Sequence, residues 1–444
     1  MARTLTVKDA YLIMNALVYQ ATGQASITVT DTASFTSAGE LVLASGTETV
    51  LNSLSLVLNR TIVAARPYKA RLDLMEEVNT GLYSSRVRKI SYYANDALPS
   101  GDFNTDLFTN FVEGYTNGQN TQANPNSTKS QWEQHPKYPV EVNFAGSSTW
   151  QYCITRYEDQ LQAAFRSPED FNAFISGWLT ESANDIESER EAWNRMILLN
   201  KIGSVYTNYG LGVMPGSVIN LTAAFNARFN TTYSSQDLLS TYLKEFLAFF
   251  VSELKKWSRM MEHRSTYFHV TPPKTDAAGN SLALLRHTPR ERQRLYMYEP
   301  LFIESNAWVL PEIFNPQFLD IGQYQAVDYW QEFADIMNGG MYVDVTPSIM
   351  DVDTTSATYG QQIKADAVET TVLALLTDVD GLMTNFQAEI ARTTPIEARK
   401  GYRNIWTTFL RNAITDDTEN AILFVMEDPA SSGGSKESDP DTKE

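Results

Sequence analysis

The longest regular pattern of apolar residues in the chain begins after Ser167, where such residues recur at steps of three and four. Ser167 can cap a helix, Pro168 suits the first helical position, and Asp170 places a negative charge in the first turn. The apolar stripe consists of Phe171, Phe174, Ile175, Trp178, Leu179, Ile186, Trp193, Met196 and Ile197. This pattern predicts one uninterrupted helix over residues 168–202, about 50 Å long at about 1.5 Å per residue.

Shorter stretches of the same periodicity predict three further helices, separated by segments without it. Their ranges are 7–19, 236–262 with Ser234 or Ser235 as cap, and 324–337, which ends at Gly339-Gly340. Residues 25–50 are Thr/Ser-rich and look extended or irregular.

Alternating or short apolar segments predict strands. They lie at 140–144, 150–154, 341–345, 371–376, 405–410 and 421–426, with short strands and turns over 264–320 and a turn at 378–381.

Residues 83–93 alternate like a strand, but neither face is clean. Arg86, Arg88, Ile90 and Tyr92 share one face, and Val87, Lys89, Ser91 and Tyr93 share the other. A strand that covers a core has one apolar side. The mixed faces therefore favour a projecting ribbon whose faces meet other chains. The alternative is an edge strand that charge keeps soluble.

Composition narrows the class of protein. The 444 residues are 43% hydrophobic and 20% charged, and the formal net charge is −18. Apolar content of this size supports a folded core, and such an acidic chain is a poor candidate for gripping nucleic acid. The single cysteine, Cys153, excludes an internal disulfide and is expected to be a small buried side chain. No signal peptide or membrane span is predicted, so we expect a soluble chain made in a cytoplasm.

Residues for catalysis or cofactor binding form only weak patterns, and no metal or cofactor is predicted. The four histidines have no metal-binding spacing. Paired acids occur at Asp351 and Asp353, at Asp378 and Asp380, and at Asp416 and Asp417. We interpret each pair as part of a turn. An acidic carbohydrate-active enzyme that uses paired carboxylates stays open as an alternative.

The order of these parts resembles the major capsid proteins of tailed bacteriophages with the Hong Kong 97-type fold, in the podovirus-like branch. Three stretches carry the resemblance: the basic ribbon 68–93 with its return through 144–154, the run 159–165 followed by the long helix, and the C-terminal segments 378–382, 394–406 and 419–426. The resemblance implies an α+β chain with an N-terminal arm, an extended β-hairpin loop, a long spine helix, and peripheral and axial domains.

The division of the chain that the resemblance implies follows the sequence order. It comprises an N-terminal arm (1–65), the extended loop (66–155), the first part of the peripheral domain with the spine helix (156–235), the axial domain (236–345), the return strands of both domains (346–428) and a disordered acidic tail (429–444). The Asn/Gln/Ser/Thr-rich segment 99–137 is expected to be a long polar loop within the extended loop.

The function that the resemblance implies is structural, with no enzyme activity and no cofactor. Copies would form hexamers and pentamers and close an icosahedral or elongated head around double-stranded DNA, which they contact non-specifically. The expected partners are the chain itself, a separate scaffolding protein and a portal protein, without a membrane. The protein would be made in the host bacterial cytoplasm and end in the virion. Another virion component, such as a tail or decoration protein, is the nearest alternative.

Six cations are the predicted subunit-contact residues, because positive charge on a ribbon can meet acidic surface on an otherwise anionic neighbour. They are Arg66, Lys69, Arg71, Arg86, Arg88 and Lys89. Some members of the family join subunits through a Lys–Asn isopeptide bond. Lys69 and Asn404 are the residues that would correspond, but no promoting Glu can be aligned, so such cross-linking is not expected.

Overall fold

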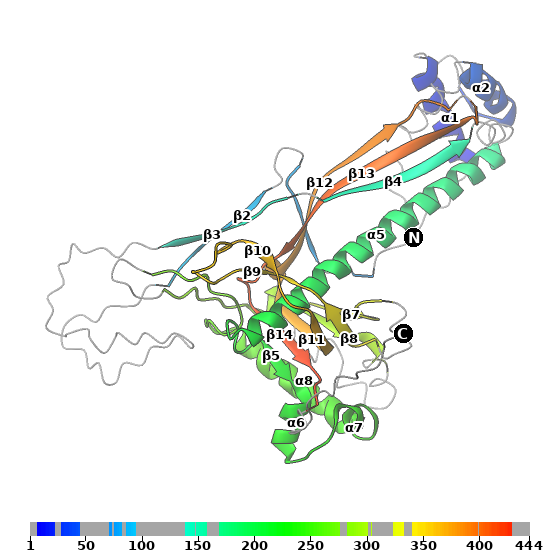
Figure 1. The fold of residues 1–444 in the computed structure, drawn as a ribbon. Helices are drawn as coiled ribbons and strands as arrows, with labels where there is room; N and C mark the ends of the chain where they lie inside the picture. Colours follow the sequence, from blue (N-terminus) through cyan, green and yellow to red (C-terminus); the bar gives the residue numbers. More distant parts are fainter. Residues whose placement is uncertain are drawn as a thin grey trace, which may run out of the picture.

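A 43-residue helix, α5 (Pro168–Gly210), runs through most of the length of the molecule and contacts both of its large sheets (Figure 1). The computed structural model describes residues 7–22, 28–44, 71–72, 75–81, 86–94, 138–146, 148–157, 168–275, 282–300, 303, 323–332, 340–397 and 399–428. The helix begins at Pro168 as predicted, but it continues past residue 202. The helix runs through Gly203. A Cβ at this position would lie 2.8 Å from Pro347, so glycine is what permits the close packing of α5 there.

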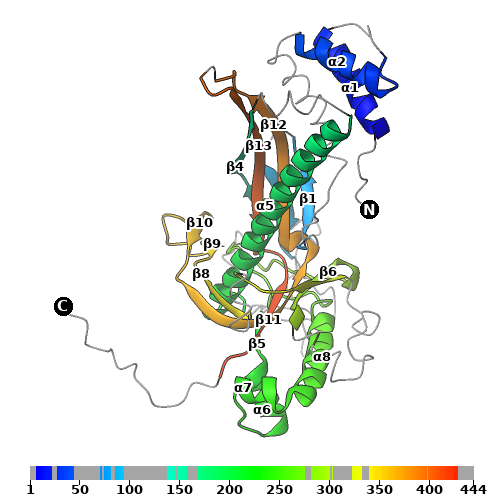
Figure 2. The same cartoon turned by 90° about the vertical axis from the view of Figure 1, so that its right-hand side faces the viewer.

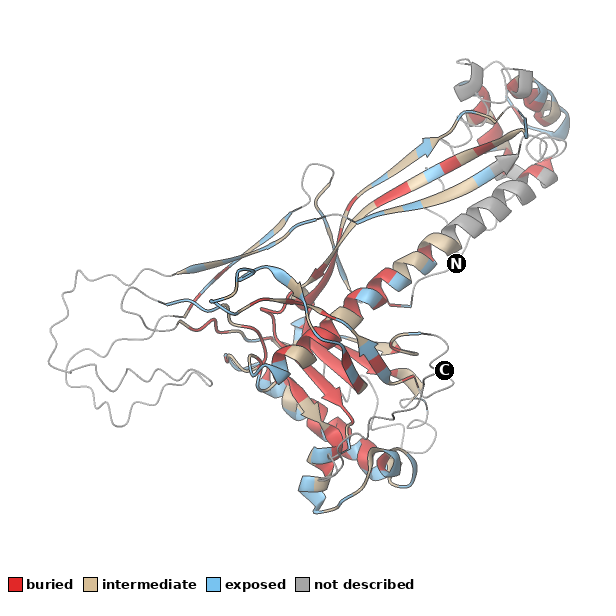
Figure 3. Ribbon diagram, in the orientation of Figure 1, coloured by how far each residue is buried: buried red, intermediate tan, exposed pale blue. Residues whose placement is uncertain are grey.

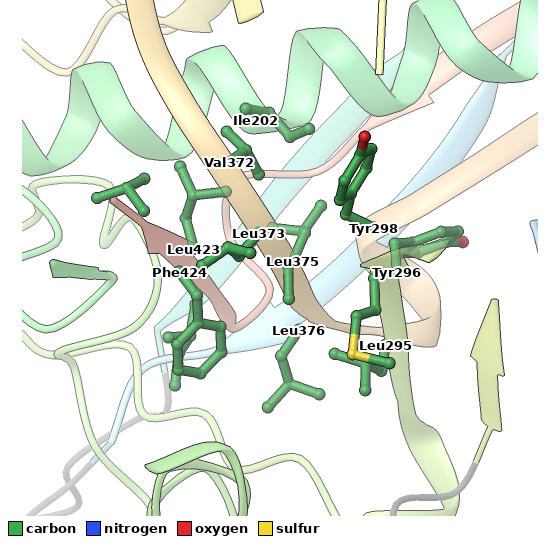
Figure 4. Packing of buried hydrophobic residues seen from close by; sticks show 14 of the residues in the cluster. Ile202, Leu295, Tyr296, Tyr298, Val372, Leu373, Leu375, Leu376, Leu423 and Phe424 are labelled. Atoms are coloured by element: carbon green, nitrogen blue, oxygen red, sulfur yellow. The ribbon is translucent and has the colours of Figure 1, made fainter. Parts of the chain in front are cut away.

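The core of the molecule is a six-stranded sheet. Its strand order is β5-β14-β11-β6-β7, and β8 pairs with the first half of β11. The strands are β5 (Val218–Asn220), β6 (Gln293–Tyr298), β7 (Gln323–Val327), β8 (Tyr342–Val345), β11 (Val368–Asp378) and β14 (Ala421–Val425). β14 is buried throughout, and Figure 4 shows its Leu423 and Phe424 beside the leucines of β11. The strands predicted at 341–345, 371–376 and 421–426 are confirmed.

A second, long sheet extends from this core along the first half of α5. Its order is β1-β12-β13-β4, with antiparallel pairing except between β1 and β12. The strands are β1 (Glu76–Asn79), β4 (Ser148–Tyr157), β12 (Leu382–Thr393) and β13 (Tyr402–Thr415). Trp150 of β4 meets Trp193 of α5 edge-on, with ring centroids 5.5 Å apart. Figure 3 shows the buried residues concentrated in the central sheet, whereas the long sheet carries many half-buried ones.

Two helices, α1 (Val7–Thr22) and α2 (Thr32–Ala44), lie at the far end of the long sheet and of α5 (Figure 2). The helix predicted at 7–19 is confirmed, but the irregular structure predicted for 25–50 is wrong over α2. Asp31 accepts a hydrogen bond from the Ser34 backbone N–H at 2.7 Å, which caps the helix. Phe35 of α2 packs on Phe171, 5.6 Å between ring centroids. The many Thr and Ser residues of this segment made the few apolar residues of α2 difficult to recognise as a helical pattern.

Three helices, α6 (Leu221–Phe229), α7 (Ser235–Ser240) and α8 (Leu243–Met260), lie at the opposite end of the molecule (Figure 2). The single helix predicted over 236–262 is in fact α7 and α8 with a break between them. Ser234 caps α7 as predicted, in a reciprocal capping box with Asp237. At the break, the ring of Tyr242 stacks on the ring of Tyr233, with ring centroids 4.1 Å apart.

The helix predicted at 324–337 is wrong over the described residues, because β7 runs parallel to β6 there. The following residue Trp330 is fully buried, and its Nε1–H donates to the Val372 carbonyl oxygen at 2.8 Å. Residues 333–339 lie outside the described part.

Short elements complete the described chain. β9 (Ser348–Met350) and β10 (Gln362–Lys364) form a hairpin, and single 3₁₀ turns occupy Arg290–Arg292 and Val379–Gly381, the latter at the predicted turn.

Candidate subunit-contact ribbon

A two-stranded ribbon reaches outward from the junction of the two sheets (Figure 1). It consists of β2 (Val87–Tyr92) and β3 (Pro139–Phe144), paired antiparallel, and neither strand joins another sheet in the described part of the chain. The return of the predicted hairpin is therefore shorter than 144–154. Residues 148–157 form β4, which pairs with β13 in the long sheet, so the return of the ribbon ends at Phe144.

The two faces of the ribbon have different surroundings. We call the face with Arg88, Ile90 and Tyr92 the outer face and the face with Val87, Lys89 and Ser91 the inner face. On the outer face, Ile90 is 50% and Tyr92 58% exposed. The predicted division of side chains between faces is confirmed. The outer face exposes apolar area that its own chain leaves uncovered in the described residues.

The inner face is held by the body of its own chain. The Lys89 ammonium contacts the carboxylates of Asp416 and Glu419, both of which are buried. At the end of the ribbon, the Tyr93 hydroxyl donates to the Pro272 carbonyl oxygen at 2.8 Å. The expectation that both faces meet other chains is thus not met for the inner face, because ion pairs and hydrogen bonds within the chain occupy it.

Lys89 joins a buried acidic turn, residues 416–420, which links β13 to β14. Lys201 of α5 is fully buried and donates to the Asp416 carbonyl oxygen at 2.6 Å and to Asp417 Oδ1 at 3.2 Å. Arg286 lies 3.4 Å from Glu419 Oε1 and donates to the Thr418 carbonyl oxygen at 3.1 Å. Three cations from three elements therefore converge on one turn, as a buried cluster of carboxylates requires.

The acidic turn also connects the ribbon to the loop before β6. Arg286 donates a second hydrogen bond, 2.7 Å long, to the hydroxyl of Ser91 on the inner face. One guanidinium thus bridges the ribbon and the turn. The ribbon is fixed at two successive inward-pointing positions, Lys89 and Ser91, while the outer face stays uncovered.

Two carboxyl groups of the acidic turn, those of Asp416 and Glu419, have shifted pKa values. Burial alone would raise the pKa of Asp416, but the nearby Lys89 and the hydrogen bonds from Lys89 and Thr418 lower it below its ordinary value. Burial raises the pKa of Glu419, against the opposing effects of Lys89 and Arg286. Asp416 is therefore the firmly ionised partner of Lys89 near neutral pH.

His269 lies fully buried beside the same turn. Burial lowers its pKa to about 4, so the ring is neutral near pH 7. Nε2 lies 2.7 Å from the Leu284 carbonyl oxygen and Nδ1 lies 2.9 Å from the side chain of Asn420. The Asn420 atom beside Nδ1 is the carbonyl oxygen Oδ1, so both partners of the ring are acceptors, and the single N–H of a neutral ring donates to one of them. Asn420 also contacts Thr288 Oγ1 at 3.2 Å.

The outer-face cations are paired along the ribbon. Arg86 and Arg88 each donate to the Glu141 carboxylate, at 2.8 Å and 2.6 Å. The Asn143 amide and then Arg88 lower the pKa of Glu141. Both arginine side chains stay more than half exposed.

Arg71 lies away from the ribbon, where it contacts Asp328 and lies 4.0 Å from Glu299. The hydrogen bond with Asp328, burial and the charge of Asp328 raise the pKa of Glu299 to about 7. Arg66 and Lys69 lie outside the described residues, as do the segment 99–137 and the tail 429–444. Asn404, the possible cross-linking partner of Lys69, accepts from the Thr155 hydroxyl at 2.8 Å.

The paired acids lie in turns, as predicted. The Asp353 N–H donates to Asp351 and the Asp380 N–H donates to Asp378, each at 3.0 Å.

Among the described residues no group of three or more His, Cys, Asp or Glu side chains could hold a metal ion. Within the same residues no helix is long and apolar enough to cross a membrane. Cys153 is half-buried, not fully buried as expected.

Sequence reasoning missed the charged residues that pair with the ribbon cations or with the acidic turn. They are Glu141, Lys201, Arg286, Asp416 and Glu419. Glu141 could have been found from the β2–β3 register, because it lies directly opposite Ile90, on the same face as Arg86 and Arg88. The other four come from distant segments, and no local pattern signals their meeting.

Comparison with known proteins gives structural likenesses alone. No family model matches the chain, and no curated protein matches it. A similar chain occurs in a capsid structure of Staphylococcus phage Andhra, at 11% identity over 81% of this chain and 84% of that chain, with a TM-score of 0.45. Another occurs in a capsid structure of the cyanophage P-SCSP1u, at 9% identity over 82% of this chain and 90% of that chain, with a TM-score of 0.38. A third occurs in the capsid asymmetric unit of cyanophage Pam1, at 10% identity over 78% of this chain and 86% of that chain, with a TM-score of 0.35. These neighbours are phage capsid structures, and all three are likenesses at very low identity.

Proposed function

We propose that this chain is the major capsid protein of a tailed double-stranded DNA bacteriophage. Its copies gather into hexamers and pentamers and close a head around the genome. The observation that carries the proposal is the ribbon, which is anchored by Lys89 on one face and exposes Ile90 and Tyr92 on the other. An exposed apolar strip on a rigidly held projection is typical of a surface that another protein covers.

The arrangement of the elements supports the same function. In this proposal α5 is the spine helix of the peripheral segment 156–235, and the axial segment 236–345 contains α7, α8 and the strands β6, β7 and β8. Residues 1–65 are the N-terminal arm and residues 346–428 return through both domains. A separate scaffolding protein and a portal protein would be partners during assembly, and the packaged DNA is contacted non-specifically.

The outer-face cations are proposed subunit contacts. Arg86 and Arg88 hold Glu141 and are more than half exposed, so their positive charge can also attract acidic groups of a neighbour. We extend this role to Arg66, Lys69 and Arg71. Lys89 contributes in another way, because it positions the ribbon from within.

Electron microscopy of the full chain, expressed alone and with the neighbouring phage genes, tests the proposal. Closed shells are the expected result. Rings, tubes or small oligomers would instead indicate a tail or decoration protein, and a fully folded monomer at high concentration would refute assembly. Hydrolysis of a glycan, lost in variants of the paired aspartates, would establish the enzyme alternative.

A pair of variants connects assembly to the ribbon. Ile90→Asp places a charge on the outer face, and Leu211→Asp makes the same change at another exposed apolar residue, after α5. We expect the first to block shells and the second to leave them intact. Equal yields from both would contradict the role of the outer face.

A further inference from the structure

Two carboxyl groups lie side by side where the strands β6 and β7 end. The parallel register of these strands pairs Tyr298 with Val327, so the next residues, Glu299 and Asp328, come to the same end of the central sheet. Tyr298 and Val327 are buried, whereas the side chains of Glu299 and Asp328 are 32% and 26% exposed. The two acids therefore meet at the boundary between the core and solvent.

One cation faces this pair. The Arg71 guanidinium contacts Asp328 and lies 4.0 Å from Glu299 Oε2. In the described chain, Asp328 and Arg71 are the groups whose charges act on Glu299. Beyond Arg71 lies Glu191 of α5, which pairs with Arg195 at 2.9 Å. Glu191 thus has a cation of its own, and the carboxyl pair has one positive charge for two acids.

Two neighbouring carboxyl groups resist ionising together, because their negative charges repel each other. The hydrogen bond with Asp328, burial and the charge of Asp328 hold the pKa of Glu299 at about 7. Glu141 on the ribbon shows the opposite balance, because the Asn143 amide and two arginines lower its pKa. The difference follows from the neighbours, which are mainly acidic in one case and cationic or hydrogen-bond donors in the other.

The carboxyl pair lies where three parts of the molecule are joined. The Arg71 carbonyl oxygen accepts from the Gln325 side chain of β7, and the Leu72 carbonyl oxygen accepts from Asn194 Nδ2 of α5 at 2.6 Å. The Arg71 N–H donates to Glu191 Oε2 at 3.4 Å. Residues 71–72 thus link β7 to α5. β7 ends the strand order of the central sheet in the described chain, so its ladder runs along β6 alone.

We propose that Glu299 and Asp328 form a proton-binding site that controls how firmly β7 and residues 71–72 are attached to the central sheet. With one proton shared, the pair carries a single negative charge, which Arg71 balances. Loss of the proton places a second negative charge beside the first, and the repulsion pushes the ends of β6 and β7 apart. The attachment is therefore firm below neutral pH and loosens above it. This inference goes beyond the proposed function, because it concerns the single chain.

Denaturant unfolding of the unassembled chain between pH 6 and 8 tests the site. A carboxyl group whose pKa is raised by folding stabilises the fold at low pH, and this effect is lost as pH rises through the folded-state pKa. With that pKa at about 7, the unfolding equilibrium constant of wild type, relative to that of Glu299→Gln, should rise about tenfold from pH 6 to 8.

The matched control is Glu245→Gln, which changes an exposed glutamate in the first turn of α8. Its unfolding equilibrium constant should follow that of wild type over the whole range. A difference between wild type and Glu299→Gln that stays constant from pH 6 to 8 would overturn the proposal.

Two further variants separate a proton site from a structural role. Arg71→Gln removes the charge that favours the ionised pair, so the midpoint of the pH dependence should move to higher pH. Asp328→Asn removes the repelling charge, so Glu299 should ionise below pH 6 and the dependence between pH 6 and 8 should disappear. A purely structural role would change stability equally at every pH. An unmoved midpoint in Arg71→Gln, or a retained dependence in Asp328→Asn, would contradict the proposal.

Hydrogen–deuterium exchange of the wild-type chain locates the change, and it needs no variant to fold. After correction for intrinsic exchange rates, peptides from β7 should exchange several-fold faster at pH 8 than at pH 6, whereas peptides from β14 should be equally protected at both. A uniform change along the chain, or none in β7, would refute the site. These measurements use the unassembled chain, so their outcome is separate from whether shells form.

Discussion

Replacement of Lys89 by alanine is the most direct test of the ribbon anchor. The ammonium lies between the carboxylates of Asp416 and Glu419, and all three side chains are at most 18% exposed. Removal of one partner from a buried ion pair costs about 3–5 kcal/mol, because the remaining charge stays buried. Arg286 still contacts Glu419, so we expect the lower end, about 3 kcal/mol.

The neighbouring residue Arg88 supplies the matched control. Arg88 points to the outer face, is more than half exposed, and pairs with Glu141. Exposed pairs contribute about 0.2–1 kcal/mol, so Arg88→Ala should lower the unfolding free energy far less than Lys89→Ala does. Denaturant unfolding of the unassembled chain at pH 7 measures both.

The pH dependence gives the anchor a further signature. The pKa of Asp416 is lower in the folded state than its ordinary 3.8, so its stabilising effect is present above that value and is lost as pH falls through the lowered pKa. The difference between wild type and Lys89→Ala should therefore be full at pH 7 and shrink in strong acid. Equal losses from Lys89→Ala and Arg88→Ala at pH 7 would refute the buried anchor.

Three other changes have defined outcomes. Gly203→Ala forces a Cβ to within 2.8 Å of Pro347 and should cost about 1–2 kcal/mol in a thermal melt, whereas Gly210→Ala meets open space and should leave stability equal or raise it by up to about 1 kcal/mol. The unfolding free energy should fall by about 3 kcal/mol between pH 6.5 and 4. In this range His269 binds a proton in the unfolded chain, but its folded-state pKa of about 4 keeps the buried ring neutral. His269→Gln should flatten this pH profile. Ser234→Ala removes the cap of α7 and should cost about 1 kcal/mol by denaturant unfolding.

The elements predicted correctly are those whose signal is local. The start of α5 followed from Pro168 and its apolar stripe. The division of the ribbon into two faces followed from the strand-like alternation of residues 83–93, although neither face is purely apolar. The strand pattern of β11 and β14 was readable because both are apolar and bounded by turns. In each case the local preference and the tertiary environment agree, so the sequence alone was sufficient.

The errors have a common physical cause, which is tertiary contact that overrides the local pattern. Residues 323–327 join β6 as a strand because a sheet edge is available there, whatever the helical spacing of the segment. The partners of Lys89 could not be foreseen, because Asp416 is more than three hundred positions away in the sequence. The pair at 416 and 417 was correctly interpreted as a turn, yet its burial beneath the ribbon depends on the whole fold.

The position of the acidic turn explains how the ribbon is aimed. β13 of the long sheet leads directly into residues 416–420, and these lead into β14 of the central sheet. The two sheets differ in packing. Eight of the ten buried side-chain polar atoms without a partner in the described chain belong to α5 or to the long sheet, including those of Asn184, Thr384 and Arg411. None belongs to a strand of the central sheet, whose strands pack through apolar side chains.

Unpaired buried polar groups cost free energy, so the long sheet, whose strands β12 and β13 carry four of them, is expected to be less stable than the central sheet, whose strands carry none in the described chain. The ribbon is tied to the central sheet. Lys89 and Lys201 hold the turn that begins β14, and β14 is buried along its whole length. The direction of the ribbon is therefore set by the apolar centre of the molecule, and it can be kept even where the long sheet adjusts its packing on α5.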